Sequence, residues 1–265
     1  MIYHIFEEIL LLDISRVENA LIIGAGHGIG LALVTQLIEM NPRIKIWATY
    51  HNQVKANPLL EYQRTNSENL TCIKNPLSEE DDIENLVGKI EHKLGGTNLN
   101  LCINCIGFLH NEDIMPEKSL RDINKQQLMK YFEVNSVLTP LLAKHIKKLF
   151  SSSEVSAFAC ISAKVGSLED NKLGGWYGYR ASKAALNMFI KNIAIDYKQS
   201  QLKTIVLAIH PGTTTTELSK PFLSHIKHTI WSPDDTAKHI IDVIEKTNIQ
   251  ESGCFKNWDN TNIPW

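Results

Sequence analysis

A tyrosine and a lysine stand four residues apart in a segment with helical character. Tyr179 and Lys183 lie in the stretch GWYGYRASKAALNMF, residues 175–189. Residues four apart share one face of a helix, so both side chains can act on one small volume. A phenol has an ordinary pKa of about 10, and a neighbouring ammonium favours its ionised form and brings that pKa toward neutrality. The pair therefore predicts acid–base chemistry.

This spacing alone is more often a solvated helix face than a catalytic pair, so other motifs decide between the two. Tyr177 is a competing phenol, but no basic residue follows it by four positions.

A glycine-rich loop, IIGAGHGIG, joins the first apolar run to the segment that follows it. Gly24, Gly28 and Gly30 have the spacing G-x-x-x-G-x-G, and Ile29 stands where the pattern G-x-G-x-x-G, which starts at Gly24 and Gly26, has its last glycine. Glycines let the backbone turn tightly and let a pyrophosphate approach a helix N-terminus. The loop therefore predicts a dinucleotide site, with a plain flexible turn as the alternative.

These residues need a scaffold, and the rest of the chain alternates between strand-like and helix-like patterns. Short apolar runs predict strands, and amphipathic stretches with a period near 3.6 predict helices. The predicted strands are 20–24, 44–50, 70–73, 99–107, 156–162 and 204–212, and the predicted helices are 31–40, 79–95, 128–150, the segment of Tyr179, and 232–247. This alternation is typical of an α/β fold, and it predicts a single-domain, Rossmann-type, doubly wound parallel sheet with helices on both faces.

Composition excludes several classes of function. The 265 residues are 43% hydrophobic and carry a net charge of -2, with a pI near 6.6. This balance predicts no nucleic-acid or membrane partner, and no apolar run is long enough to span a bilayer. Residues 1–18 form an N-terminal extension ahead of the Rossmann-type domain at 19–265. The extension holds Glu7 and Glu8 and lacks a basic start, so it does not resemble a signal peptide, and a cytoplasmic location is expected.

Five cysteines, an odd number, favour reduced buried thiols over a disulfide framework. Cys102 and Cys105 form a C-x-x-C, which would suit a redox pair or half of a zinc site. No second ligand pair stands nearby, so we expect core thiols and no metal site.

Five motifs in one order resemble the short-chain dehydrogenase/reductase family, and in particular its carbonyl-reductase branch of sniffer-type and C-factor-like proteins. The motifs are the glycine loop, NCIG at 104–107, Asn135, Tyr179 with Lys183, and HPG at 210–212. The resemblance implies an NAD(P)-dependent oxidoreductase that moves a hydride between nicotinamide and a carbonyl or hydroxyl carbon. It also implies that Tyr179 is the acid/base, that Lys183 binds the nicotinamide ribose, and that Asn135 holds a water of a proton relay.

The cofactor preference depends on the end of the second strand. NAD-binding folds place an acidic residue there, about 20 residues past the glycine loop, but this chain has Tyr50. His27 and His51 stand where NADP-preferring relatives carry arginine, and Lys55 can add charge. Histidine donates to a phosphate best at low pH. NADP(H) is therefore the favoured cofactor, and NAD(H) is the alternative. The plain interpretation of His27 and His51 is that they are surface histidines without a role in cofactor binding.

The family pattern implies further cofactor contacts. Asn75 stands where the family has an adenine-binding Asp, and its amide oxygen can accept the same hydrogen bond. Asn104 and Gly107 match the family's N-N-A-G turn, whose middle residues are here cysteine and isoleucine. The turn after the sixth strand adds Pro211, Gly212, Thr214 and Thr216.

The serine that the family uses to bind the substrate carbonyl is displaced in this chain. It usually stands three residues before a glycine, and counting back from Gly166 gives Ala163. Successive strand residues point to opposite faces, so Ser162 is not an equivalent position. Ser162 is the favoured substitute; Ser167 from the following loop, or Tyr179 acting alone, are the alternatives.

The substrate is expected to be a small-molecule carbonyl or alcohol. Residues 217–232 predict a partly apolar lid, with loop 166–176 as the opposite wall. The apolar helix after Tyr179 suits either core packing or a homodimer or homotetramer interface. A dinucleotide-binding sensor with little turnover is the alternative function. The apolar lid residues are Phe222, Leu223, Ile226 and Trp231.

Overall fold

The computed structural model describes residues 10–265, so the first nine residues of the predicted extension lie outside the described part. Seven strands form one sheet, in the order β3-β2-β1-β4-β5-β6-β9, and every neighbouring pair is parallel. The strands are β1 (Asn19–Ile23), β2 (Lys45–Tyr50), β3 (Leu70–Lys74), β4 (Leu101–Asn104), β5 (Ser156–Ile161), β6 (Thr204–His210) and β9 (Cys254–Asn257). The predicted parallel sheet is confirmed.

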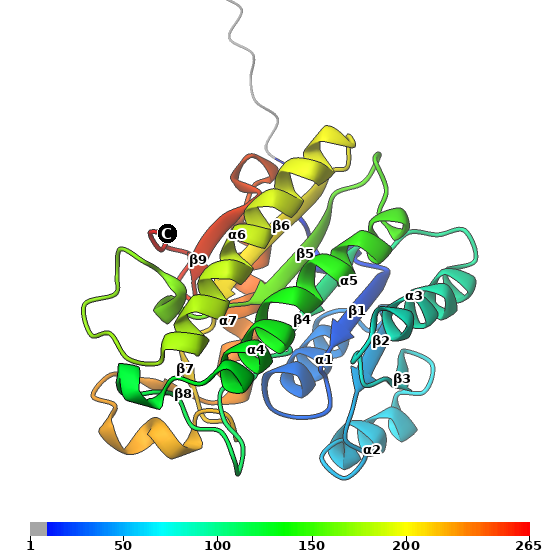
Figure 1. Ribbon diagram of the computed structural model, residues 1–265. Coiled ribbons are helices and arrows are strands. Elements are labelled where there is room, and N and C mark those ends of the chain that lie inside the picture. The colour runs from blue at the N-terminus through cyan, green and yellow to red at the C-terminus, as the bar shows by residue number, and fades with distance from the viewer. Residues whose placement is uncertain (1–9) are drawn as a thin grey trace, which may run out of the picture.

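Helices cover both faces of this sheet, as Figure 1 shows, with α6, α5 and α3 on one side and α1 and α7 behind it. The helices are α1 (Gly28–Met40), α2 (Asn57–Thr65), α3 (Glu80–Leu94), α4 (Lys125–Phe132), α5 (Leu138–Ile146), α6 (Tyr177–Gln199) and α7 (Pro233–Lys246). Two short strands, β7 (Thr213–Thr214) and β8 (Ile230–Trp231), pair separately. The predicted doubly wound α/β fold is confirmed.

The alternation of side chains along β1 creates the two cores. Ala20 and Ile22 face the core under α1 and α7, whereas Leu21 and Ile23 face the core under α3, α5 and α6. All four side chains are fully buried. A strand covered on both faces is apolar throughout, which is why this run is so easily recognised in the sequence.

The order of strands reverses between β1 and β4, and this point positions the site. β1 pairs with both β2 and β4, and Ile23 lies opposite Asn104 in the ladder. The loops that leave these two strands therefore diverge to opposite faces and open a crevice at the carboxyl edge of the sheet. The glycine loop follows β1 and the NCIG turn follows β4, so both border that crevice.

Three features of the fold differ from the sequence prediction. Helix α2 occupies a polar stretch left unassigned, and β9 adds a seventh strand near the C-terminus. The helix predicted over 128–150 is divided by a turn of π-helix at Glu133–Val137. Such turns are common at functional sites, and this one contains Asn135.

The described part of the N-terminal extension is built into the domain. Leu12, Ile14 and Val17 are buried in the core beneath α1 and α7. The Asn41 side-chain amide donates to the carbonyl oxygens of Ile14 (3.0 Å) and Val17 (2.7 Å). Residues 10–18 therefore belong structurally to the Rossmann-type domain, whose predicted start was residue 19.

Truncation of Ile14 tests this packing. Its side chain is fully buried, so Ile14→Ala is expected to lower the free energy of unfolding by about 2–5 kcal/mol in urea denaturation. Leu11→Ala is the control: Leu11 is 44% exposed, and we expect a change of at most about 0.5 kcal/mol. Equal losses in both variants would contradict the placement.

Among the described residues, no helix is long and apolar enough to cross a membrane. The cytoplasmic location and the self-association stay predictions.

Candidate active site

A cleft of about 1030 Å³ opens at the crevice between β1 and β4. Loops after β1, β2 and β4 line it, together with the π-helical turn and residues 217 and 218. Thr49, Leu77, Phe108 and His110 line it as well, and sequence reasoning missed them because nothing local marks them. The predicted cofactor residues among its lining are Gly24, Gly26, His27, Tyr50, His51, Asn75 and Gly107.

The glycine loop is held open for a ligand. Gly24 has a φ of 78°, which favours glycine, and its N–H donates to the Thr49 hydroxyl at 3.0 Å. A Cβ on Gly30 would lie 2.3 Å from the Gly24 carbonyl oxygen, so only glycine lets α1 start this close to the turn. His27 precedes α1 and makes no side-chain cap. The first N–H groups of α1 therefore remain available to a pyrophosphate.

The second cofactor wall carries the groups that decide the dinucleotide. Desolvation is the main cause that lowers the pKa of His27; the nearby charges of Glu217 and Lys55 act in opposite directions. His51 is exposed at the end of β2. Lys55 forms an ion pair with Glu217, and both residues line the cleft. These contacts bring His27 and Lys55 into one electrostatic environment.

The two asparagines of the cofactor prediction are engaged in fixing loops. The Asn75 oxygen accepts from the Leu77 N–H at 2.8 Å, and its amide donates to the Asp82 carbonyl at 2.9 Å. The Asn104 oxygen accepts from the Ile106 N–H at 3.1 Å, and its amide donates to the Thr139 hydroxyl. Both side chains therefore shape the backbone beside the cleft.

Asn135 clamps the segment that follows the NCIG turn. Its oxygen accepts from the Phe108 N–H at 2.7 Å, and its amide donates to the Phe108 carbonyl at 2.9 Å and to the Ser182 hydroxyl at 3.1 Å. The π-helical turn places this side chain between the β4 loop and α6. Asn135 is 2% exposed, so it joins the two elements in the interior.

Tyr179 and Lys183 are buried on the inner face of α6, next to Asn135. The Lys183 ammonium lies 5.9 Å from the centre of the Tyr179 ring and donates to the Ile161 carbonyl at 3.0 Å. A Cβ on Gly107 would lie 3.6 Å from the Lys183 Nζ and 3.8 Å from the Asn135 Oδ1. The structure therefore brings Tyr179, Lys183, Asn135 and Gly107 together.

Burial controls the pKa values of this pair. Burial raises the pKa of Tyr179 well above its ordinary value, and the neighbouring Tyr131 raises it further. Burial also lowers the pKa of Lys183 to about 8. This direction is opposite to the lowering of the Tyr179 pKa that the sequence predicts, because burial of the phenol is the main cause of the shift.

A buried carboxylate holds the start of α6, and sequence reasoning missed it. Glu117 is 1% exposed; its Oε2 accepts from the Gly178 N–H at 3.2 Å, and its backbone oxygen accepts from the Trp176 N–H at 2.5 Å. A negative charge at a helix N-terminus is favourable. Glu117 therefore anchors the turn from which Tyr179 projects.

The two candidate serines do not share the surroundings of Tyr179. The Ser162 hydroxyl is buried and donates to the Asn187 oxygen at 2.7 Å, and the Ser167 hydroxyl accepts from the Asp170 N–H at 3.1 Å. Ala163 instead packs in the apolar cluster of Tyr179. The Ser162 hydroxyl is thus engaged by Asn187, whereas we expected it to reach the substrate.

An aromatic wall surrounds Tyr179 and continues to the lid. The ring of Tyr179 lies 6.0 Å from Trp176 and 6.1 Å from Tyr131, and Trp176 lies 5.0 Å from Phe222. Phe222 contacts His110 at 5.6 Å. Loop 166–176 and the lid therefore meet over Tyr179. Trp231, expected in the lid, packs instead against His239 and Trp258.

The turn after β6 lies behind the glycine loop. Gly212 has a φ of 76°, and a Cβ there would lie 2.9 Å from Trp231. The Thr214 hydroxyl bonds the Thr236 hydroxyl at 2.8 Å. A Cβ on Gly28 would lie 3.5 Å from the Thr216 Cγ2, so Thr216 adjoins the loop. Some predicted cofactor residues are not in the cleft lining: Gly28, Ile29, Gly30, Asn104, Tyr179, Lys183, Pro211, Gly212, Thr214 and Thr216.

The C-x-x-C does not form a disulfide. All five cysteines are free, and burial raises the pKa of the Cys102 and Cys105 thiols. Within residues 10–265, no group of three or more His, Cys, Asp and Glu side chains is arranged to hold a metal ion.

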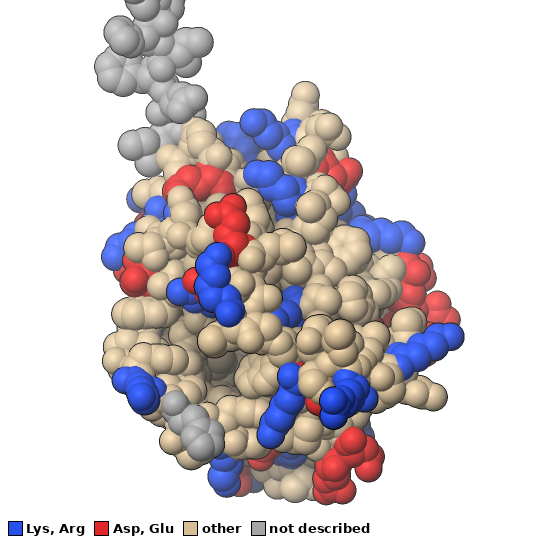
Figure 2. All heavy atoms as spheres, turned by 60° about the vertical axis from the view of Figure 1, so that its left-hand side comes forward, with Lys and Arg blue, Asp and Glu red and all other residues tan. Residues whose placement is uncertain are grey.

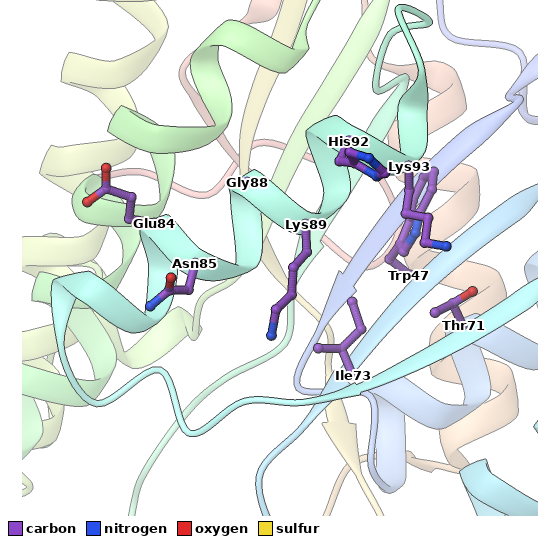
Figure 3. A pocket seen from close by; sticks show the side chains of 9 residues that line it. All are labelled: Trp47, Thr71, Ile73, Glu84, Asn85, Gly88, Lys89, His92 and Lys93. Carbon is purple, nitrogen blue, oxygen red and sulfur yellow. The ribbon is translucent and has the colours of Figure 1, made fainter.

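A second hollow, of about 550 Å³, lies between α3 and the strands β2 and β3 (Figure 3). Trp47 and Ile73 come from the strands, and Lys89 and Lys93 come from α3. None of the predicted site residues lines it. On the face shown in Figure 2, acidic and basic side chains are interspersed around a hollowed, mostly uncharged area, with no patch of a single sign.

The fold and this site define a nicotinamide-dinucleotide-binding protein of the doubly wound class. The sequence model of the short chain dehydrogenase family matches residues 18–227. The chain belongs to that family and is an NAD(P)-dependent oxidoreductase that acts on a small-molecule substrate.

Known proteins resemble the chain over most of its length. The 1-hydroxy-2-glutathionyl-2-methyl-3-butene dehydrogenase of Rhodococcus sp. is 26% identical, over 71% of this chain and 77% of that protein. The carbonyl reductase Sniffer of D. melanogaster superposes with a TM-score of 0.83 at 25% identity, over 94% of this chain and all of the other. An NADPH-bound carbonyl reductase from chicken fatty liver gives a TM-score of 0.82 at 24% identity, over 94% and 100%.

Proposed function

We propose that the protein is an NADP(H)-dependent carbonyl reductase in which Tyr179 is the acid. This proposal rests on the position of Gly107, which lines the cleft and lies close to the Lys183 ammonium and the Asn135 oxygen. A dinucleotide in the cleft would thus have its reactive end beside Tyr179 and Lys183. The N–H groups at the start of α1, which the His27 side chain does not cap, and the close turn at Gly30 fit a pyrophosphate.

Each residue then has a distinct role. The bound nicotinamide supplies or accepts the hydride. Tyr179 donates its phenolic proton to the carbonyl oxygen, and its raised pKa keeps that proton in place until the oxygen becomes negative. Lys183 binds the ribose and stabilises the phenolate that remains. Asn135 holds the β4 loop against α6.

The preference for NADP(H) rests on charge. Tyr50 ends β2 where an acidic residue would bind the ribose of NAD, and His27, His51 and Lys55 line the same part of the cleft. The chicken carbonyl reductase, whose fold is similar, binds NADPH.

The surroundings of Tyr179 suit an apolar, aromatic carbonyl compound. The side chains clustered there are Leu109 and Tyr131, with partly buried Phe108, Ile114, Ala163, Val165, Trp176, Leu218 and Phe222. Aromatic rings favour edge-to-face or offset contacts with other rings. A substrate with charged groups beside its carbonyl would lose hydration here without gaining a partner.

The pKa of Lys183, about 8, gives an expected pH profile. Below pH 8 the ammonium is charged; above it the charge is lost, so kcat/KM for carbonyl reduction should fall about tenfold per pH unit. Tyr179 stays protonated over the same range, so its ionisation causes no further decrease in kcat/KM. Rates measured from pH 6 to pH 10 check this, and a flat profile would contradict the role of Lys183.

The proposed function is tested by the oxidation of NADPH and NADH with a panel of aryl ketones, aromatic diketones and small aliphatic aldehydes. We expect turnover with NADPH that exceeds turnover with NADH, and a preference for the aromatic compounds. Tight binding of NADPH without turnover on any member would favour the alternative, a dinucleotide-responsive sensor.

A further inference from the structure

One ion pair joins two segments that line the cofactor cleft. Lys55 comes from the segment after β2, and Glu217 comes from the segment after β7, 162 residues away. Both residues line the cleft, and their side chains are 48% and 64% exposed. The pair therefore joins the wall that receives the adenosine end of a dinucleotide to the lid over the substrate side.

Neighbouring residues hold the backbone at Glu217 in place. The Nε2 of His110 lies 3.3 Å from the Glu217 carbonyl oxygen and 3.1 Å from that of Leu218. Thr216 adjoins Gly28 at the start of α1. Glu217 is thus held between the glycine loop, which follows β1, and the loop that follows β4.

The charges around Glu217 identify its partner. The pKa of the Glu217 carboxyl is lowered first by its hydrogen bond from Lys55, and His27 and Lys220 add smaller attractions. The pKa of His27 is lowered from its ordinary value, mainly by desolvation, so its imidazole carries little charge near pH 7. Lys55 is therefore the main cation for any anion at this end of the cleft.

We infer that Glu217 is a specificity-determining residue that competes with the ribose 2′-phosphate of NADP(H) for Lys55. This inference rests on the proposed NADP(H) preference. An exposed carboxylate–ammonium pair contributes little, because solvent screens it. A phosphate monoester carries a charge of about −1.5 to −2 and three acceptor oxygens, so it displaces the carboxylate. NADH has no such group and leaves the pair intact.

The experiment measures the dissociation constants of NADPH and NADH by calorimetry for the wild-type protein, Glu217→Gln, Lys55→Met and the double variant. Glu217→Gln is expected to tighten NADPH binding about two- to fivefold and to leave NADH binding unchanged. Lys55→Met should weaken NADPH binding about tenfold. In the Lys55→Met background, Glu217→Gln should not change the dissociation constant of NADPH.

Glu91→Gln is the matched control. Glu91 forms an ion pair of 2.6 Å with Lys148, and neither residue lines the cleft. We expect this variant to bind both dinucleotides as the wild type does. A tightening of NADPH binding in Glu91→Gln as large as in Glu217→Gln would show that the effect comes from the change in net charge alone, and it would overturn the inference.

The outcomes separate this inference from the cofactor proposal. If the wild type prefers NADPH but Glu217→Gln changes nothing, or tightens both dinucleotides equally, the inference fails alone. If the wild type shows no preference and Glu217→Gln creates one, the inference stands and the wild-type NADP(H) preference is wrong. If neither protein shows a preference, both fail.

Discussion

Tyr179→Phe is expected to lower kcat for carbonyl reduction by about 10²–10⁴, the usual contribution of a positioned acid. The ring of Tyr179 lies in edge contact with Trp176 and Tyr131, and phenylalanine keeps those contacts. The substitution therefore removes the proton donor while the apolar cluster stays filled. Steady-state oxidation of NADPH with an aryl ketone measures the loss.

Two controls make this result specific. Tyr177→Phe removes a phenol from the same helix and should leave kcat within about twofold, because Tyr177 lies outside the apolar cluster of Tyr179. The NADPH dissociation constant of Tyr179→Phe should match that of the wild type. A Tyr179→Phe variant that retains most of its turnover would exclude Tyr179 as the acid.

Ala163→Ser is expected to raise kcat/KM by about tenfold to a hundredfold. Loss of one oxyanion donor commonly costs about 10²–10³ in rate, and position 163 packs beside Tyr179 without any donor. A hydroxyl there would give the carbonyl oxygen a second hydrogen bond as charge develops on it. The backbone at Ala163 is extended, with φ −148° and ψ 139°, which serine adopts without strain.

Ser162→Ala is the paired measurement. The Ser162 hydroxyl donates to Asn187 in the interior, so its removal should lower stability by about 1–3 kcal/mol and leave kcat unchanged. A fall of a hundredfold in kcat for Ser162→Ala, with no gain for Ala163→Ser, would return Ser162 to the mechanism and contradict the placement of its side chain.

The sequence was sufficient for the sheet and for the glycine loop because both depend on local patterns. A buried parallel strand is apolar at every position, as β1 is, and a close helix start demands glycine, as at Gly30. Gly107 borders the cleft because the loops after β1 and β4 diverge at the point where the strand order reverses.

The features that sequence reasoning missed depend on contacts between distant segments. The π-helical turn at Asn135 has no local signal, and the Lys55–Glu217 pair joins residues 162 positions apart. The effect of burial on the Tyr179 pKa also arises only in the folded protein, where Tyr131 and Trp176 exclude water. Sequence spacing can identify the charged neighbour of a side chain, but it does not show how far the fold removes that side chain from water.

The most direct test of hydride transfer at this site is mass spectrometry of the alcohol formed from an aryl ketone and NADPH that carries deuterium in place of both hydrogens at nicotinamide C4. The account predicts a product with deuterium on the former carbonyl carbon, formed at least a hundredfold more slowly by Tyr179→Phe. An undeuterated alcohol, or no product while NADPH binds normally, would contradict it.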